Sequence, residues 1–317
     1  MVNGILLIDK PVGITSNRAV GIVRRRLGRS VKVGHTGTLD PAASGLLVIL
    51  AGTATRALDF LDETKKRYKV TIRLGEESDT CDSEGTIVVT GNPSNLSAEQ
   101  IGSCLKEFEG PIDQLPPHFS AIKKDGVPLY RLARKGIFPN LEKRKVEIFK
   151  ISVIEWRAPD LNIDLVCSKG TYARSLARDI GICLRVGGRV ETLRRIASGS
   201  FDVNTAHSID FIESAPLNRL VESRIELAEA LKHIPQLDVS QVDLEKLACG
   251  VWVDYRPELS CDQDAEIAPG DRLYRVQDAE GLLVIMVRVD ITGECVRLKP
   301  VKVFNAFPQS AIEQKHE

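Results

Sequence analysis

The sequence predicts an α+β protein that ends in a small all-β unit. Over residues 1–235, helical and strand-like segments interleave without the regular alternation that a doubly wound parallel sheet requires. After Pro235 the strand-like segments are short and separated by turn signals, which is typical of a small barrel or sandwich. A hydrophobic content of 43% and a charged content of 27% are those of a globular chain, and 317 residues are enough for two domains.

Local patterns near the N-terminus predict a strand, a helix and two further apolar segments. The apolar run Gly4–Ile8 predicts a strand, and Ser16–Leu27 predicts a helix with Ser16 as its N-cap. Leu46–Ala51 fits either a buried strand or the start of a buried helix, because so short an apolar run carries no period. Thr53–Leu61 has helical spacing.

The central part of the chain contains three predicted strands and two predicted helices. Arg67–Leu74 alternates apolar and polar residues and predicts a strand, as do Val146–Ile154 and Asn162–Cys167. Ser97–Phe108 predicts a helix that Ser97 caps, and Tyr172–Leu184 predicts a second helix. The acidic, turn-rich segment ESDTCDSEG after the first of these strands is interpreted as a loop.

Residues 110–150 are interpreted as an excursion from the core. Prolines and glycines interrupt this segment, and Pro117–Lys150 holds nine Lys and Arg against three Asp and Glu. A basic helical piece is expected over Leu129–Lys135. The segment is therefore expected to project from the core as a cationic element.

Four strand-like segments follow the change of character near residue 235. We place the domain boundary within Ile234–Leu237, which gives domains 1–235 and 236–307, and we interpret residues 308–317 as a flexible tail. The expected strands are Val251–Tyr255, Asp271–Val276, Leu282–Val289 and Cys295–Leu298.

The charge of the chain is unevenly distributed although its net value is zero. Residues 1–200 hold 31 Lys and Arg against 22 Asp and Glu, whereas residues 201–317 hold 12 against 21. Such an asymmetry indicates an anionic partner for the basic part, and chance segregation of solvated charges is the alternative. 

Other classes of protein are disfavoured by composition. No apolar run approaches the roughly 20 residues that cross a bilayer, and no secretory leader is apparent. The seven cysteines are scattered and form no CxxC or Cys/His cluster, which predicts reduced thiols, a cytoplasmic protein and no structural metal site.

The segment GHTGTLDPAASGLL, residues 34–47, places one carboxylate among small and turn-forming residues. A turn is one explanation for Asp40, because Asp-Pro and Thr/Gly clusters favour turns. A phosphate-binding loop would need a Lys after the second glycine of its motif, and none follows Gly37. A nucleophilic carboxylate is the remaining interpretation.

A carboxylate that acts alone needs a cation and a shaped pocket, and the segment CSKGTYARSLARDIG offers candidates for both. Tyr172 and Arg174 lie two residues apart near the start of the predicted helix. Core packing of Tyr172 and a surface ion pair for Arg174 explain each residue equally well when it is taken alone.

Several long motifs together resemble the TruB family of tRNA pseudouridine synthases. They are GILLIDKPVGITSN, HTGTLDPAASGLL, KRYKVTIRLG, PPHFSAIKKDGVPLYRLARKG, CSKGTYARSLARDIG, VETLRRI and LKPVKVF. The resemblance covers nearly the whole chain and is weakest over residues 201–250. It implies a pseudouridine-synthase-type domain with a mixed, largely antiparallel sheet, an RNA-clamping insertion at about 116–145, and a C-terminal PUA-like β-barrel.

The resemblance also implies roles for individual residues. Asp40 is expected to be the catalytic aspartate and Arg174 its ion-pair partner, while Tyr68 stacks on the target base and Tyr172 completes the pocket. Leu193 is expected to pack against the base. The expected RNA-binding residues are His35, which helps to extrude the uridine, the insertion residues Lys123 and Arg134, and Lys10 and Arg56, of which Lys10 is also explained by a purely structural role.

The implied reaction is the conversion of the uridine at position 55, in the T-loop of transfer RNA, to pseudouridine. Glycosidic cleavage, base rotation and rejoining at C5 require neither a metal nor a cofactor. Asp40 either attacks C1′ or removes a proton from C2′, and the sequence does not choose between them. A final base must remove the C5 proton, and the candidates are Tyr68, as a catalytic residue, or a water. A monomer that binds transfer RNA without a guide RNA is expected.

Three rival interpretations stay open. The chain could be an RNA-binding or RNA-folding protein with little catalysis, or a guide-dependent synthase, although the insertion favours recognition without a guide. A glycosidase acting through an aspartate would need a second, paired carboxylate, and no motif supplies one.

Overall fold

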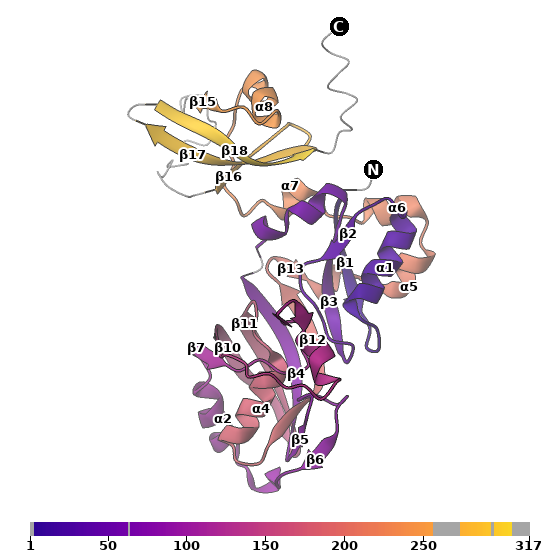
Figure 1. Cartoon of the computed structure of the whole chain (residues 1–317), viewed down its shortest axis with the longest axis vertical. Coiled ribbons are helices and arrows are strands. Elements are labelled where there is room, and N and C mark those ends of the chain that lie inside the picture. Colours follow the sequence, from indigo (N-terminus) through magenta and orange to yellow (C-terminus); the bar gives the residue numbers. More distant parts are fainter. Residues whose placement is uncertain (1–2, 63, 256–272, 293–294, 306–317) are drawn as a thin grey trace.

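The computed structural model describes residues 3–62, 64–255, 273–292 and 295–305. Figure 1 shows two sheets along the longest axis of the molecule, with the small C-terminal sheet at one end and the β5–β6 ribbon at the other. In the described part of the chain, no helix combines the length and the apolar character needed to cross a membrane.

A ten-stranded mixed sheet forms the framework of the larger part. Its main path runs β14-β1-β3-β12-β4-β11-β10-β7, with β2 paired to β3 and β13 paired to β12. All pairs are antiparallel except β1/β14 and β3/β12, so the expected mixed, largely antiparallel sheet is confirmed. The strands are β1 (Gly4–Lys10), β2 (Val33–His35), β3 (Ala43–Ala51), β4 (Lys65–Leu74), β7 (Gly110–Gln114), β10 (Arg144–Arg157), β11 (Asp160–Ser168), β12 (Gly188–Ser198), β13 (Phe201–Asp202) and β14 (His207–Ser208).

The first helix, α1, spans Ser16–Leu27 as predicted, but its cap is the preceding residue. The Thr15 hydroxyl accepts a hydrogen bond from the backbone N–H of Arg18 at 3.1 Å, as an N-cap side chain does. Ser16 is buried and exchanges hydrogen bonds of 2.9 and 2.8 Å with the carbonyl and N–H of Leu39. The assignment of Ser16 as the cap was therefore wrong, because a long-range contact takes its hydroxyl.

Neither Leu46–Ala51 nor Thr53–Leu61 forms a regular α-helix. Leu46–Ala51 belongs to strand β3, whereas the helical spacing of Thr53–Leu61 is divided between two 3₁₀ helices, η1 (Gly52–Arg56) and η2 (Leu58–Phe60). The predicted helices near residues 98 and 173 are present as α2 (Ala98–Lys106), with a capping box between Ser97 and Gln100, and α4 (Ala173–Cys183).

The remaining elements are short. The acidic segment after β4 forms part of a small ribbon, and the insertion contains one hairpin and one helical turn, so its basic helical piece is confirmed but ends at Ala133. These elements are β5 (Glu76–Ser78), β6 (Ile87–Val89), η3 (Pro93–Asn95), β8 (Lys123–Lys124), β9 (Val127–Pro128), α3 (Leu129–Ala133), η4 (Val203–Thr205), α5 (Ile209–Ser214), α6 (Leu217–Glu222) and α7 (Leu227–Ala230).

The C-terminal part contains helix α8 (Gln241–Ala248) and a four-stranded antiparallel sheet of order β15-β18-β17-β16. The described residues show this sheet and do not show its closure into a barrel. The start of the strand expected at Asp271–Val276, and the tail 308–317, lie outside the described residues. The strands are β15 (Val253–Tyr255), β16 (Leu273–Gln277), β17 (Leu283–Thr292) and β18 (Cys295–Asn305).

The two sheets share one layer of buried side chains. Ile5 and Leu7 of β1 and Leu46 of β3 pack in a single cluster with Met286 and Phe304 of the C-terminal sheet. Side chains on the other face of β1 and β3 belong to a second cluster, which also contains buried residues of α1 and α4. Both faces of these two strands are therefore buried.

Gly45 in β3 sets how closely β12 can approach. Its φ of +99° suits glycine, and a Cβ at this position would lie 2.2 Å from the carbonyl oxygen of Arg195 in β12. Gly45→Ala is therefore expected to lower the free energy of unfolding by about 2–4 kcal/mol, through overpacking and backbone strain together. Urea denaturation measures this loss.

Gly102→Ala is the matched control for that measurement. Gly102 lies in α2, and a Cβ there would meet no atom within 4 Å. Alanine in a helix is favoured over glycine by about 1 kcal/mol, so this variant is expected to be slightly more stable than the wild type. Equal stabilities for the two variants would contradict the close approach of β12 to β3.

Candidate active site

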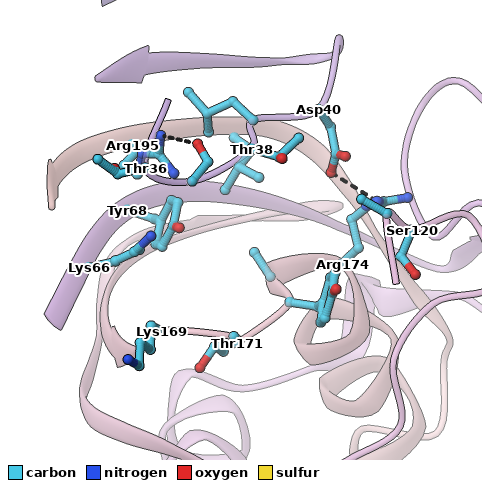
Figure 2. A pocket seen from close by; sticks show the side chains of 17 residues that line it. Thr36, Thr38, Asp40, Lys66, Tyr68, Ser120, Lys169, Thr171, Arg174 and Arg195 are labelled. Carbon is cyan, nitrogen blue, oxygen red and sulfur yellow. Dashed lines mark hydrogen bonds and ion pairs between the residues drawn. The ribbon is translucent and has the colours of Figure 1, made fainter. Parts of the chain in front are cut away.

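A cavity of about 460 Å³ opens between the loop after β2, strands β4 and β12, the start of α4 and the base of the insertion. Figure 2 shows its walls, with Asp40 and Arg174 on one side and Tyr68 and Lys66 on the other. The lining residues are Thr36, Gly37, Thr38, Leu39, Asp40, Lys66, Tyr68, Ser120, Ala121, Lys169, Gly170, Thr171, Tyr172, Ala173, Arg174, Leu193 and Arg195.

Backbone contacts from several elements hold the loop that carries Asp40. The N–H of Thr36 donates to the carbonyl of Val48 at 3.1 Å, and the two hydrogen bonds with Ser16 fix Leu39, directly before Asp40. The carbonyl of Asp40 itself accepts from the N–H of Ala43 at 3.1 Å. The loop is therefore a turn, as its composition predicts, and the turn presents the Asp40 carboxylate to the cavity.

Arg174, in the first turn of α4, joins three separate parts of the chain. Its guanidinium forms an ion pair with the Asp40 carboxylate at 2.9 Å, which Figure 2 marks by a dashed line. It donates to the carbonyl of Thr80 in the acidic loop at 3.1 Å and to that of Phe119 in the insertion at 2.9 Å. Because the Arg174 side chain is only 6% exposed, these contacts replace its hydration.

Asp82 is the second carboxylate beside Arg174, at 3.4 Å. It is buried, and it accepts hydrogen bonds from the Thr80 hydroxyl at 2.5 Å and the Glu84 N–H at 3.0 Å. The interpretation of its segment as a plain loop therefore missed a carboxylate of the site. No local pattern marks Asp82, because its partner lies 92 residues later in the chain.

The pKa of Asp40 is raised, although an ion pair with arginine would by itself lower it. Burial raises the pKa of Asp40 above its usual 3.8, Arg174 opposes this, and Asp82 raises the pKa further. The desolvation cost of the charged form thus outweighs the attraction of Arg174. The ion pair holds a carboxylate that takes up a proton more readily than an exposed aspartate does.

Tyr68 projects from β4 into the cavity wall opposite Asp40. It is 8% exposed, and burial raises the pKa of its phenol, while the neighbouring Arg195 lowers it. Arg195 is the residue paired with Tyr68 across the β4/β12 ladder. A flat ring that is held at the edge of an open cavity is suited to stacking on a base.

Tyr172 occupies the N-cap position of α4, and its backbone is held by hydrogen bonds to the Gln114 side chain. Its N–H donates to the amide oxygen of Gln114 at 2.8 Å, and the amide nitrogen of Gln114 donates to the Tyr172 carbonyl at 3.1 Å. Burial raises the pKa of the Tyr172 phenol, opposed by Arg144 and Ser120. The buried Gln114 of β7 thereby fixes the direction in which α4 begins.

The other predicted site residues lie at different distances from this cavity. Leu193 lines it, and His35 lies at the end of β2, next to the lining residue Thr36. Lys10 is fully buried and donates from Nζ to the carbonyls of Pro11 and Ile14, both at 2.9 Å, and burial lowers its pKa to about 8. These contacts give Lys10 a structural task in the loop after β1.

Arg56 and the two insertion residues do not line the cavity. The Arg56 guanidinium donates to the carbonyl of Val303 at 3.1 Å and lies over the ring of Phe304, so it contacts the C-terminal sheet. Lys123 is exposed in β8, and Arg134 is exposed after α3, where it lies over the Tyr130 ring. Their RNA-binding roles stay predictions.

Three cationic residues of the cavity were missed by sequence reasoning. Lys66 and Lys169 line it, and so does Arg195, which donates to the carbonyls of Leu46 at 2.7 Å and Gly37 at 3.0 Å. Lys66 and Arg195 belong to motifs quoted above, in which only Tyr68 and Leu193 were selected. Among the residues that the structure describes, no group of three or more His, Cys, Asp or Glu side chains is placed to hold a metal ion.

Comparison with known proteins identifies the same family across the chain. Residues 24–173 match the model of the TruB family pseudouridylate synthase N-terminal domain. Residues 174–234 match the model of the tRNA pseudouridylate synthase B C-terminal domain. Together, the two models span the cavity-lining residues and the elements that carry them.

Curated relatives extend the match beyond these models. The tRNA pseudouridine synthase B of Syntrophotalea carbinolica is 44% identical over 250 residues, covering 78% of this chain and 81% of that protein. The tRNA pseudouridine synthase B of Geobacter sulfurreducens is 36% identical over 308 residues, covering 96% of this chain and all of that protein.

A solved structure shares the fold. One chain of a Cbf5-Nop10-Gar1 complex matches with a TM-score of 0.69 and 25% identity, covering 98% of this chain and 86% of that one. Fold and sequence therefore agree. The chain belongs to the TruB family of tRNA pseudouridine synthases, which are isomerases.

Proposed function

We propose that this chain isomerises the uridine at position 55, in the T-loop of transfer RNA, to pseudouridine. The observation that carries the proposal is the Asp40 carboxylate, which Arg174 holds at 2.9 Å in the wall of an open cavity that Tyr68 also lines. The related enzymes named above act on tRNA by their names. Uridine 55 as the target rests on the motif resemblance.

The reaction conserves all atoms of the nucleotide. The N1–C1′ bond breaks, the base turns, a C5–C1′ bond forms, C5 loses its proton and N1 gains one. Ionised Asp40 carries out the first step of the reaction, either by bonding to C1′ or by taking a proton from C2′. Arg174, which is only 6% exposed, orients the carboxylate, and the carboxylate itself stays open to the cavity at 35% exposure.

The cavity is proposed to receive one extruded nucleotide. A base within a folded RNA loop has to leave its stack before its sugar carbon becomes accessible. Tyr68 and Leu193 provide a ring and an apolar side chain in the cavity wall, which Tyr172 also lines. His35, at the head of the same loop as Asp40, is proposed to occupy the space that the base leaves.

The rest of the RNA is proposed to lie against basic surfaces outside the cavity. Lys123 and Arg134 are exposed on the insertion. The C-terminal sheet is proposed to be part of a PUA-like barrel that adds a weaker contact. Lys10 and Arg56 are proposed to support the RNA-binding surface by holding the loop after β1 and the C-terminal sheet. We propose a monomer that acts without a guide RNA.

Removing the positive charges of the insertion is expected to lower the affinity for RNA and to make that affinity less dependent on salt. Replacing Lys123, Lys124, Arg131 and Arg134 by Gln keeps Leu129 and Ala133, which are buried and anchor the insertion. Each lost phosphate contact lowers the slope of log K against log salt by roughly 0.7–0.9. Filter binding to an unmodified tRNA transcript at several salt concentrations measures the slope.

A matched pair of substitutions controls for the loss of charge. Arg219→Gln and Lys232→Gln remove two surface cations that already pair with Glu222 and Glu229. We expect these to leave the affinity and the slope unchanged. Deletion of residues 122–138 is the coarser variant, and undiminished binding by either insertion variant would exclude the clamp.

The raised pKa of Asp40 predicts an acid limit to the reaction. The ionised form is required, and its folded-state pKa lies above 3.8, so the single-turnover rate is expected to fall as the pH drops through that raised value. Asp82→Asn removes one cause of the raised pKa and should move the acid limb to lower pH. An acid limb that does not move would contradict the coupling of the two carboxylates.

The decisive test of the proposed function is incubation with an unmodified tRNA transcript, followed by mapping of pseudouridine. We expect modification at the T-loop uridine and nowhere else. Modification at another position would overturn the specific assignment. Binding without modification would favour an RNA-binding or RNA-folding protein instead.

A further inference from the structure

Arg195 is a fully buried cation in the wall of the cavity. Its exposed fraction is 1%, the guanidinium Nε donates to Leu46 O at 2.7 Å, and Nη2 donates to Gly37 O at 3.0 Å. The other arginines of β12 differ: Arg189 pairs with Glu76 at 2.6 Å and Arg194 with Asp9 at 2.7 Å. Within the described ranges of the chain, no carboxylate forms an ion pair with Arg195.

A buried guanidinium without a carboxylate partner is costly to the fold. The backbone around Arg195 is nevertheless built to admit it. Two backbone carbonyls accept hydrogen bonds from the guanidinium, and a Cβ on Gly37 would lie 2.6 Å from Lys66 Nζ, so the glycine admits cationic side chains to this wall. The two carbonyls replace part of the hydration that the buried guanidinium loses, so the structure holds a cation in the cavity wall in spite of the cost of burying it.

The side chain opposite Arg195 is Tyr68. The two are ladder partners in the β4/β12 pair and both line the cavity. The charged and titratable groups that act on the Tyr68 phenol are Arg195 from β12, Cys167 from β11 and Asp40 from the loop before β3, and the same cavity is lined by Lys66, Lys169 and Arg174. Burial, the largest cause, raises the pKa of the Tyr68 phenol, and Cys167 and Asp40 raise it further, while Arg195 opposes them by its charge and a side-chain hydrogen bond.

We propose that Arg195 is a positioning residue that aligns Tyr68 with the Gly37–Asp40 loop and stabilises negative charge on the Tyr68 phenol oxygen. The inference rests on the proposed function in one respect, the use of that oxygen. As phenolate, Tyr68 accepts the proton from C5, the C–H electron pair restores the uracil ring, and the phenol afterwards returns the proton to solvent. The charge of Arg195 makes the phenolate accessible at lower pH, and the hydrogen bonds from Arg195 to the carbonyls of Leu46 and Gly37 fix the guanidinium beside the phenol.

The phenol of Tyr68 can be titrated without any reaction. The chain has five tyrosines, so full-length protein labelled with 3-fluorotyrosine gives few ¹⁹F resonances, and loss of one in Tyr68→Phe assigns Tyr68. Removing a unit positive charge beside a phenol raises its pKa by about one to three units. We therefore expect the Tyr68 resonance of Arg195→Met to titrate at higher pH than in the wild type by that amount.

Two further variants separate this role from a merely structural one. Arg195→Lys keeps the charge but cannot reach both carbonyls, so the Tyr68 pKa should rise less in this variant than in Arg195→Met. Arg195→Lys also serves as the test if Arg195→Met does not fold. Arg189→Met, on the same strand and equally buried, should leave the Tyr68 pKa where it is. The single-turnover rate is expected to fall about 100-fold in both Arg195 variants, with tRNA affinity retained.

The outcomes are distinct. A Tyr68 pKa that stays at the wild-type value in the Arg195 variants, or that moves as far in Arg189→Met, overturns the proposal even if the rate falls. An active wild type with an unmoved Tyr68 pKa leaves the proposed function intact and removes this inference. If the wild type forms no pseudouridine but the Tyr68 pKa still rises in the Arg195 variants, the role of Tyr68 as a base is excluded. The coupling between Tyr68 and Arg195 is then still supported.

Discussion

Asp40→Asn is expected to abolish pseudouridine formation while leaving the fold and tRNA binding intact. An amide is nearly the same size as a carboxylate, but it can neither bond to C1′ nor take a proton from C2′. Loss of an essential carboxylate typically costs at least about 10⁴-fold in rate. Prolonged incubation of the variant with an unmodified transcript, followed by pseudouridine mapping, measures the residual rate.

The stability of this variant is part of the same prediction. The folded-state pKa of Asp40 is raised, so folding favours the neutral form, and the ionised form at neutral pH destabilises the fold. Asn should therefore be as stable as Asp or more stable at neutral pH, and the difference should shrink as the pH falls through the raised pKa. Such an exchange of stability for activity is common at active sites.

Asp160→Asn is the matched control. Asp160 also pairs with an arginine, Arg73, at 2.6 Å, but lies in β11 and does not line the cavity. Its loss should leave the rate of modification unchanged. Full activity in Asp40→Asn, or an equal loss in Asp160→Asn, would overturn the assignment of Asp40.

Arg174→Met is expected to lose both activity and stability. The buried Asp82 carboxylate would lose its ion-pair partner, and removal of one partner from a buried pair costs about 3–5 kcal/mol. The Asp40 side chain is 35% exposed, so water offsets more of its loss. The carbonyls of Thr80 and Phe119 would also lose their donor, so the acidic loop and the insertion would each lose one hydrogen bond to α4.

The effect on activity can be separated from the effect on stability. Asp82→Asn combined with Arg174→Met removes the unpaired buried charge and should restore part of the stability but none of the rate. Thermal unfolding and single-turnover kinetics measure the two. Arg178→Met, one turn later in α4, is the control, since Arg178 contacts Leu115 and Asp179 and leaves the Asp40 pair untouched. Recovery of activity in the double variant would contradict the role of Arg174.

Sequence reasoning predicted best where the signal was local. The bounds of α1, the cap at Ser97 and the alternation of Arg67–Leu74 depend on neighbouring residues, and all three are present. Leu46–Ala51 stayed ambiguous for a physical reason. Its alternate side chains enter the two different buried clusters, so both faces are apolar and no period remains in the sequence.

The parts of the site that escaped prediction depend on contacts between distant segments. Asp82 is one acid among several in its loop, and only the burial of Arg174 beside it makes it distinctive. Ser16 resembles a cap by composition, yet Leu39 takes its hydroxyl. Arg195 is one of two adjacent arginines in VETLRRI, and only the pleat of β12 shows which of them faces Tyr68.

The layer of side chains between the two sheets ties the catalytic loop to the far end of the chain. Strand β3 begins three residues after Asp40, and its side chains Leu46, Val48 and Leu50 pack in the cluster that Met286 and Phe304 complete. Melting of the C-terminal sheet would expose one face of β3 to water. The chain should therefore unfold in one cooperative transition. Truncation near residue 235 removes no residue of the cavity, but it should destabilise β3 and with it the loop that carries Asp40.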